Sequence, residues 1–117
     1  MSTTPRVTSL GELIAILPYS LGFRPHESLV VVGLKGGVLD GVARADLSDV
    51  GPGEGCVLLA PLLAHGVDAV VVIGLETVAG QSHLAVPEVA QEADAVGLHV
   101  LESVVVRDGR WWRFGAL

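Results

Sequence analysis

The stretch "SLVVVGLKGGVLDGVARADL", residues 28–47, has the pattern of two consecutive β-strands joined by a tight turn. Its opening part, 28–34, is apolar almost throughout and does not alternate, which is typical of a strand buried on both faces. "KGG" at 35–37 supplies residues that accept positive φ in a turn. The remainder follows a period of two, which suits an edge strand half in solvent. Its solvent-side positions are Asp40, Val42, Arg44 and Asp46. The stretch therefore predicts a β-hairpin made of one interior strand and one edge strand.

Upstream of this hairpin, the sequence predicts a short helix over residues 10–17. Ser9 and Glu12 have the spacing of a capping box, and Pro18 ends the apolar run that follows. Four apolar side chains fall on one side of this helix: Leu10, Leu13, Ile14 and Leu17. The helix is therefore expected to pack on a sheet.

Downstream, the pattern alternates between helices and strands. "LSDVGPGEG" at 47–55 is too rich in Gly and Pro for regular structure, and a helix over about 54–65 follows it. A second helix is opened by Pro87 and closed by Gly97. The stripes expected to be buried on these helices are Leu58, Leu59, Leu62 and Leu63, then Val89, Ala90, Ala93 and Val96. Strands are expected at 69–75, 99–106 and 110–114, with an Asp108-Gly109 turn joining the last two.

This order, α-β-β-α-β-α-β-β, predicts one α/β domain over residues 1–117 with a mixed five-stranded sheet and helices packed on it. The apolar first strand belongs in the interior, which favours the strand order 2-1-3-4-5. Strands two, three and four are expected to be parallel to one another, with strands one and five antiparallel to them. Right-handed crossovers place the second and third helices on one face. The helix over 10–17 would then cover the other.

This topology brings several polar segments to one end of the sheet. Strand one begins where strands three and four finish, and open α/β sheets bind ligands beyond the carboxyl ends of their strands. The candidate ligand-binding residues at this rim are Arg24, His26, Glu27, Glu76 and His83. A structural role is the favoured alternative, because Pro25 fixes the entry to the strand and Arg24 can pair with Glu27 or with loop carbonyls. No catalytic residue is identified.

Composition excludes several classes of function. The net charge of −6, without a Lys/Arg cluster, disfavours nucleic acid. No segment approaches the roughly 20 apolar residues that a membrane-spanning helix needs, and no signal peptide is recognisable.

A single cysteine, Cys56, suits a cytoplasmic protein. Four scattered histidines give no metal-ligand spacing, and no cofactor motif is found. "GPGEG" at 51–55 and "GQSHL" at 80–84 depart from phosphate-loop and nucleophile-elbow patterns, so both are interpreted as plain loops.

Two long stretches, "LIAILPYSLGFRPHESLVVVGL" at 13–34 and "VVVRDGRWWRF" at 104–114, resemble the signatures of the actinobacterial family called domain of unknown function 4192. "GVARADL" at 41–47 fits as well, so the resemblance covers most of residues 9–114. Family members are typically longer and continue into a cysteine-containing, largely helical region, so only the N-terminal portion is matched. The resemblance implies an α/β fold in a bacterial cytoplasm, and it assigns no activity and no catalytic residue.

Two functions remain open at this point. Only 17% of the residues are charged, against about 25% in typical chains, which suggests that a partner covers part of the surface. Alternation sends Trp111 and Trp112 to opposite faces of the last strand, so one of them, with Phe114 nearby, is expected to face water. We therefore expect a non-enzymatic interaction module that forms a homodimer through this strand. The alternative is a small-molecule binding or hydrolytic site at the rim that uses Arg24, His26 and Glu27.

Overall fold

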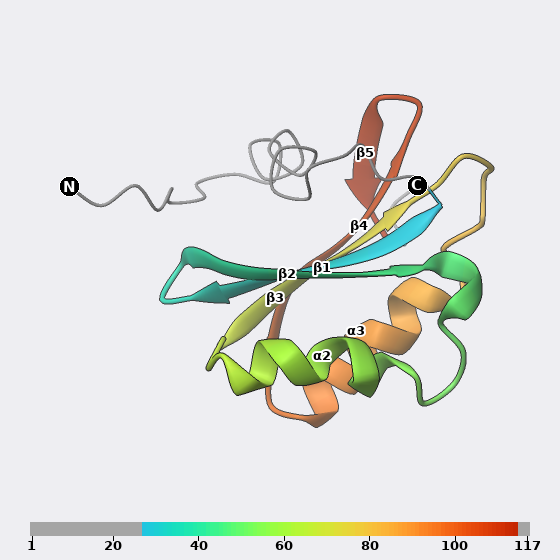
Figure 1. Cartoon of the computed structure of the whole chain (residues 1–117). Helices are drawn as coiled ribbons and strands as arrows, with labels where there is room; N and C mark the ends of the chain where they lie inside the picture. Colours follow the sequence, from blue (N-terminus) through green and yellow to red (C-terminus); the bar gives the residue numbers. More distant parts are fainter. Residues whose placement is uncertain (1–26, 115–117) are drawn as a thin grey trace.

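The computed structural model describes residues 27–114, which form a twisted sheet with two helices packed against it (Figure 1). In chain order, the elements are β1 (Ser28–Lys35), β2 (Val38–Asp46), a 3₁₀ turn (Leu47–Asp49), α2 (Gly55–Ala64), β3 (Ala69–Leu75), α3 (Ala85–Ala95), β4 (His99–Arg107) and β5 (Arg110–Arg113). No helix within this part of the chain is long and apolar enough to cross a membrane. The helix expected over 10–17 lies outside the described residues.

The strand order is β2-β1-β3-β4-β5, as the sequence predicts. β1 pairs antiparallel with both β2 and β3, β3 pairs parallel with β4, and β5 returns antiparallel to β4. β1 and β3 therefore lie at the centre, where both faces and both edges of each strand are occupied. Their side chains are apolar almost throughout because every position except Lys35, at the end of β1, is buried.

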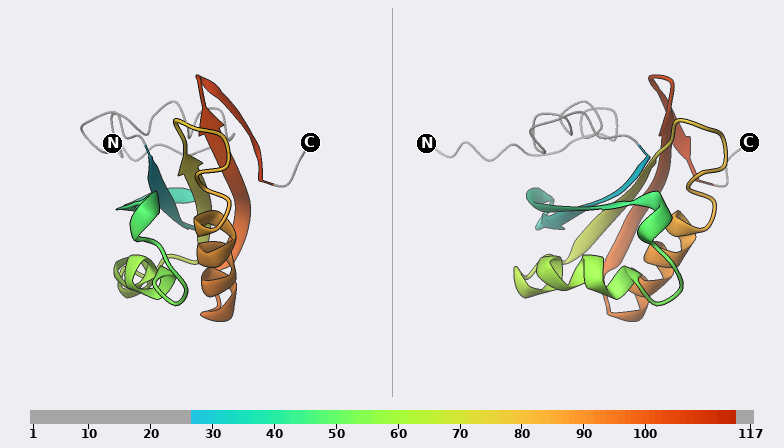
Figure 2. Two further views of the ribbon diagram at one scale, coloured as in Figure 1. Left: turned by 90° about the vertical axis from the view of Figure 1, so that its right-hand side faces the viewer. Right: turned by 45° about the vertical axis from the view of Figure 1, so that its right-hand side comes forward.

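α2 and α3 pack on the same face of the sheet, which we call the helix-covered face (Figure 2). Leu29 and Val31 of β1, with Val70 and Val72 of β3, meet the helices there. The alternate residues of these strands point to the opposite side, the second face. There they form another buried cluster with β4: Val30, Val32, Leu34, Ala69, Val71, Ile73, Leu75 and Val104. The α/β sheet with both long helices on one face is thus confirmed.

The Asp108-Gly109 turn is also confirmed. Both residues have positive φ, at 55° and 72°, which is the backbone of the two-residue turn whose twist matches that of antiparallel strands. Asp tolerates this conformation and Gly accepts it without strain. The turn holds β5 against the last residues of β4.

Three details differ from the sequence-based expectation. The alternation of β2 breaks at Asp40, which is left without a partner because Gly33 pairs with Gly41 and Leu34 with Leu39. This is a β-bulge, and period-two counting across it is wrong.

Leu63 is partly exposed because α2 packs through Leu59 and Leu62, and Leu63 lies on its flank. Val96 is exposed because α3 ends at Ala95.

Candidate functional site

A buried carboxylate organises the rim, the edge of the sheet where β1 begins and β3 and β4 end. Glu76 directly follows β3, and its side chain is only 3% exposed. One carboxylate oxygen accepts hydrogen bonds from the backbone N–H (2.8 Å) and the hydroxyl of Ser82. The other accepts from Nη1 of Arg107 at 2.9 Å. Glu76, Ser82 and Arg107 form what we call the polar cluster, which joins the ends of β3 and β4 to the loop before α3.

Gly74 makes this cluster possible. It lies two residues before Glu76, on the helix-covered face, and the loop before α3 lies directly on it. A Cβ at residue 74 would lie 2.5 Å from Cβ of Ser82 and 2.9 Å from Cγ2 of Val86. No side chain fits in that space. The absence of a side chain therefore lets Ser82 approach the carboxylate of Glu76.

The cluster holds Glu76 in its ionised form. Burial alone raises the pKa of Glu76, but hydrogen bonds from the hydroxyl and backbone N–H of Ser82, the hydrogen bond from Arg107 and its positive charge lower it. The net effect lowers the pKa of Glu76 below its ordinary value. A carboxylate with a lowered pKa is a poor proton acceptor at neutral pH. The arrangement suits a structural ion pair better than a general base.

A second set of hydrogen bonds ties the start of β1 to the same loop. Oε1 of Gln81 accepts from the backbone N–H groups of Thr77 (2.7 Å) and Val78 (3.0 Å). Its Nε2 donates to Oε1 of Glu27 at 2.8 Å. Glu27 has a φ of +48°, which is uncommon for a residue other than glycine. Backbone strain of this kind persists where surrounding contacts enforce it, and it is found often at functional sites.

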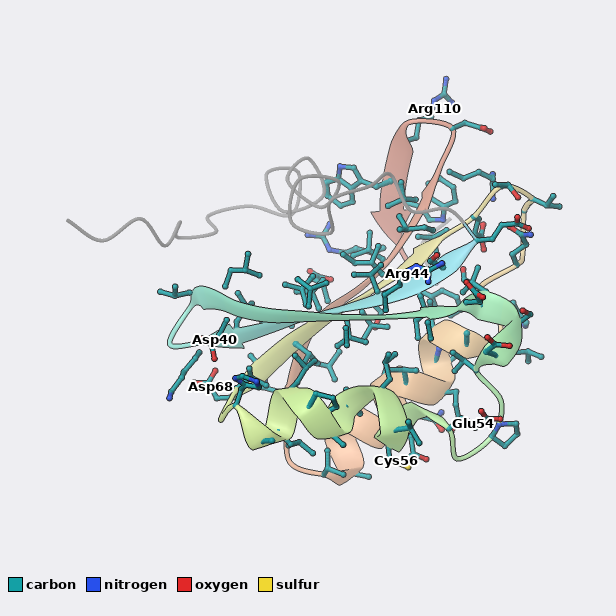
Figure 3. The ribbon with its side chains drawn as sticks, in the orientation of Figure 1. Asp40, Arg44, Glu54, Cys56, Asp68 and Arg110 are labelled. Atoms are coloured by element: carbon teal, nitrogen blue, oxygen red, sulfur yellow. The ribbon has the colours of Figure 1, made fainter. Side chains whose placement is uncertain are left out.

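Beside Glu27 the surface forms an open hollow of about 440 Å³. Arg44 of β2 lies at its wall, on the side of the sheet away from the helices (Figure 3). Its Nε donates to Oγ of Ser28 at 3.0 Å and its Nη2 to Oδ1 of Asp46 at 2.7 Å. Among the described residues, the hollow is lined by Glu27, Arg44, Asp46, Leu47, Ser48 and Gln81. It presents two carboxylates and one guanidinium to solvent.

The structure brings only some of the candidate ligand-binding residues together. Glu27 and Glu76 lie at the same rim, and each is hydrogen-bonded to the loop before α3. His83 is exposed and lies beside Phe114, with 6.4 Å between the ring centroids. Arg24 and His26 lie outside the described residues. Within residues 27–114, no group of His, Cys, Asp or Glu is placed to hold a metal ion.

The β4–β5 hairpin separates the two tryptophans. Trp112 pairs with Val105, and the guanidinium of Arg107 lies 4.8 Å from the centroid of its ring. Trp111 pairs with Val106 on the second face and is 38% exposed. Alternation thus places the two rings on opposite faces, as the sequence predicts. Phe114 packs on the helix-covered face, and it therefore does not accompany the outward tryptophan.

Sequence reasoning missed Ser82, Gln81 and Arg107 as parts of the rim. Ser82 and Gln81 belong to a loop that looked merely polar, and their roles depend on how that loop folds back. Arg107 did carry a signal, because a charged residue ending a buried strand needs a partner. The carboxylate of Glu76, at the end of the neighbouring strand, could be expected to supply this partner.

Comparison with known proteins gives one informative match. No curated protein matches the chain. The family model described as "Domain of unknown function (DUF4192)" matches residues 11–116, nearly the whole chain. The central hairpin, the rim and the tryptophan strand all fall inside the match. The chain therefore belongs to the DUF4192 family.

Proposed function

We propose that this domain is a non-enzymatic interaction module that forms a homodimer through β5. The observation that carries the proposal is Trp111, a large apolar ring that is 38% exposed on the last strand of the sheet. Tryptophan is among the residues that most often dominate binding energy at protein interfaces. Among the described strands, β5 pairs with β4 alone, so its outer backbone groups can pair with a further strand.

The two edges of the sheet differ in how well they resist such pairing. β2 carries the bulge at Asp40. Bulges are devices that keep edge strands from pairing with other chains. In the hairpin, Arg107 is paired with Glu76 and Arg113 with Glu102. Because each of these arginines is paired with a carboxylate, two copies of β5 that face each other repel one another less.

The setting we propose is the cytoplasm of an actinobacterium. The lone cysteine, Cys56, is exposed and makes no disulfide, and an unpaired thiol suits a reducing compartment. The actinobacterial origin rests on the resemblance of the sequence stretches at 13–34 and 104–114.

The experiment is light scattering on the wild type at micromolar concentration, beside Trp111→Glu and a control, Val57→Glu. Val57 is 75% exposed on α2, so the control adds the same charge to another apolar surface position. We expect a dimer mass for the wild type and for Val57→Glu. Trp111→Glu should weaken association by about 30-fold, which corresponds to the roughly 2 kcal/mol of a buried aromatic anchor. A monomeric wild type, or equal dissociation by both variants, would contradict the proposal.

The rim supports a second candidate, a small-molecule binding or hydrolytic site built on Arg24, His26 and Glu27. The open hollow and the positive φ of Glu27 favour it. Saturation-transfer NMR with a library of small polar fragments tests this candidate on the wild type and on Glu27→Gln. Fragments that bind the wild type and are lost from the variant would support the rim site. Fragments that bind both equally would count against it.

A further inference from the structure

α2 is apolar on every side, although it meets the core through one side only. None of its ten residues is charged or carries a side-chain amide. Leu59 and Leu62 are buried, but several other apolar side chains of the helix reach solvent: Val57, Ala60, Pro61, Leu63 and Ala64. A surface helix normally carries charged and polar residues on its outer side, and a helix that is apolar all round is normally buried. α2 therefore has the composition of a helix that is covered on its outer side as well.

A hollow beside α2 gives a covering segment a place to bind. α2 lies along the edge strand β2 (Figure 1), and between them the surface forms an open hollow of about 540 Å³, which we call the α2–β2 groove. Binding sites typically have volumes of about 300–1,000 Å³. The apolar lining of the groove includes Ala43, Ala45, Val50, Val57, Leu58 and Pro61. The two alanines of β2 have short side chains, so the space between strand and helix stays open.

One end of the α2–β2 groove is acidic. Asp49, in the turn after β2, and Glu54, directly before α2, line the groove where the helix begins (Figure 3). Among residues 27–114, neither of these side chains forms an ion pair or a hydrogen bond. Arg44 also lines the groove, but its guanidinium is paired with Asp46. The two carboxylates are therefore complementary to a cation that a partner supplies.

We propose that the α2–β2 groove binds a short segment of a partner protein that carries apolar side chains next to a lysine or arginine. The apolar side chains lie against Val57 and Pro61, and the cation faces Asp49 and Glu54. A second copy of this chain fits less well, because a two-fold contact pairs the groove with itself and Arg44 is already engaged by Asp46. A membrane surface also fits less well, because its anionic headgroups repel carboxylates.

The groove is separate from the surface proposed for the dimer. β2 and β5 are the two opposite edges of the described sheet, so a partner segment at α2 and a second copy at β5 do not compete for space. The inference does not depend on the proposed dimer. A monomeric wild type would leave the groove in place.

The first test selects a displayed library of random eight-residue peptides against the full chain. The enriched peptides should carry apolar residues next to Lys or Arg, and fluorescein-labelled copies of them are then titrated with variants by fluorescence anisotropy. Val57→Glu puts a charge on the apolar wall and should weaken binding at least about tenfold. Val78→Glu is the control, because Val78 is 62% exposed in the loop before α3, outside the groove. The proposal would be overturned by a library without enrichment, or by equal affinity for the wild type and both variants.

The second test concerns the acidic end. Asp49→Asn combined with Glu54→Gln should weaken binding of the same peptides about two- to five-fold at low salt, and less at high salt, because the carboxylates are exposed. Asp40→Asn combined with Asp94→Asn removes the same charge from exposed positions outside the groove and should have no such effect. An equal loss in the control would show that net charge alone attracts the peptides. That result, or enriched peptides without a basic residue, would contradict the proposal.

The other two occupants are tested with the same variant of α2. Wild type and Val57→Glu are sedimented with vesicles of phosphatidylcholine and phosphatidylglycerol, and their masses are compared by light scattering. We expect neither protein to bind vesicles and both to have the same mass. Vesicle binding that Val57→Glu abolishes would assign the outer side of α2 to a membrane. Dissociation caused by Val57→Glu would assign it to a second copy, and either result would overturn the proposal.

Discussion

The centre of the sheet and the β4–β5 hairpin are built from strands of the same sheet, but different forces hold them. In the centre, β1 and β3 bury apolar side chains on both faces, and Leu29, Val31 and Val72 have no exposed surface. In the hairpin, β5 is four residues long, and charged side chains link it to β4: Arg113 pairs with Glu102, and the guanidinium of Arg107 lies over the ring of Trp112. Packing in the centre makes the fold, and the surface that we propose for the dimer lies on the more lightly held hairpin.

The largest effect is expected from shortening a side chain in the centre. Leu29→Ala removes most of a fully buried side chain from the cluster that packs against α2 and α3, and it leaves a cavity there. The free energy of unfolding should fall by about 2–5 kcal/mol. Urea denaturation measures it, with Leu101→Ala on β4 as the control, because Leu101 is 46% exposed. The control should change stability by no more than about 0.5 kcal/mol. Similar losses for both variants would remove the distinction between the two regions.

The next effect comes from the polar cluster, which links the centre to the hairpin. Glu76→Gln keeps the shape of the side chain but removes the charge that faces Arg107, and it disturbs the acceptor of two hydrogen bonds from Ser82. Stability should fall by about 1–3 kcal/mol. Glu54→Gln, an exposed position before α2, is the matched control and should be neutral. An unchanged midpoint for Glu76→Gln would show that the hairpin is held without this carboxylate.

The same variant gives a dependence on pH. Because the pKa of Glu76 is lower in the folded chain than in the unfolded chain, unfolding takes up a proton as the pH falls. The stabilisation is fully present above the ordinary glutamate pKa of about 4.3, and it is lost as the pH falls through the lowered folded value. The stability gap between the wild type and Glu76→Gln should therefore be constant near neutrality and shrink at acid pH. Denaturation series from pH 7 downward measure the gap, and a constant gap would contradict the shift.

The sequence predicted the centre better than the rim, and the reason is physical. An apolar run without alternation, such as 29–34, is compatible with few environments, so β1 had to lie between other strands and under helices. The contacts of Glu76 and Gln81 depend on where a loop of exposed polar residues folds back. Many such conformations have similar local energies, and Gly74 alone gives no sign that Ser82 will lie on it. The bulge at Asp40 was missed for a similar reason, because it follows from pairing with β1 and not from β2 alone.

A smaller effect is expected at the tip of the hairpin. Gly109 has a φ of 72°, and a β-branched side chain there is strained by about 1–2 kcal/mol. Gly109→Val should lower stability by that amount and should weaken the proposed dimer as well, because the turn sets the position of Trp111. Gly37→Val, in the turn before β2, carries a comparable strain at a φ of 82° but lies at the other edge of the sheet. Melting and light scattering on both variants should show similar stability losses, with weaker association only for Gly109→Val. If the two variants associate equally well, Trp111 is not part of the interface.

The smallest effect is expected from the ion pair between Arg113 and Glu102. Nε of Arg113 lies 2.8 Å from Oε1 of Glu102, but the arginine side chain is 58% exposed, so water screens the pair. A double-mutant cycle with Arg113→Ala and Glu102→Ala should give a coupling below about 1 kcal/mol in dilute, monomeric protein. The guanidinium also lies 6.0 Å from the ring centroid of Trp111, so a dimer that buries this ring excludes water from the pair. The coupling should then rise when the same cycle is measured on association rather than on unfolding. A coupling that is equally small in both measurements would place the interface away from β5, because a pair beside a buried tryptophan cannot stay fully hydrated.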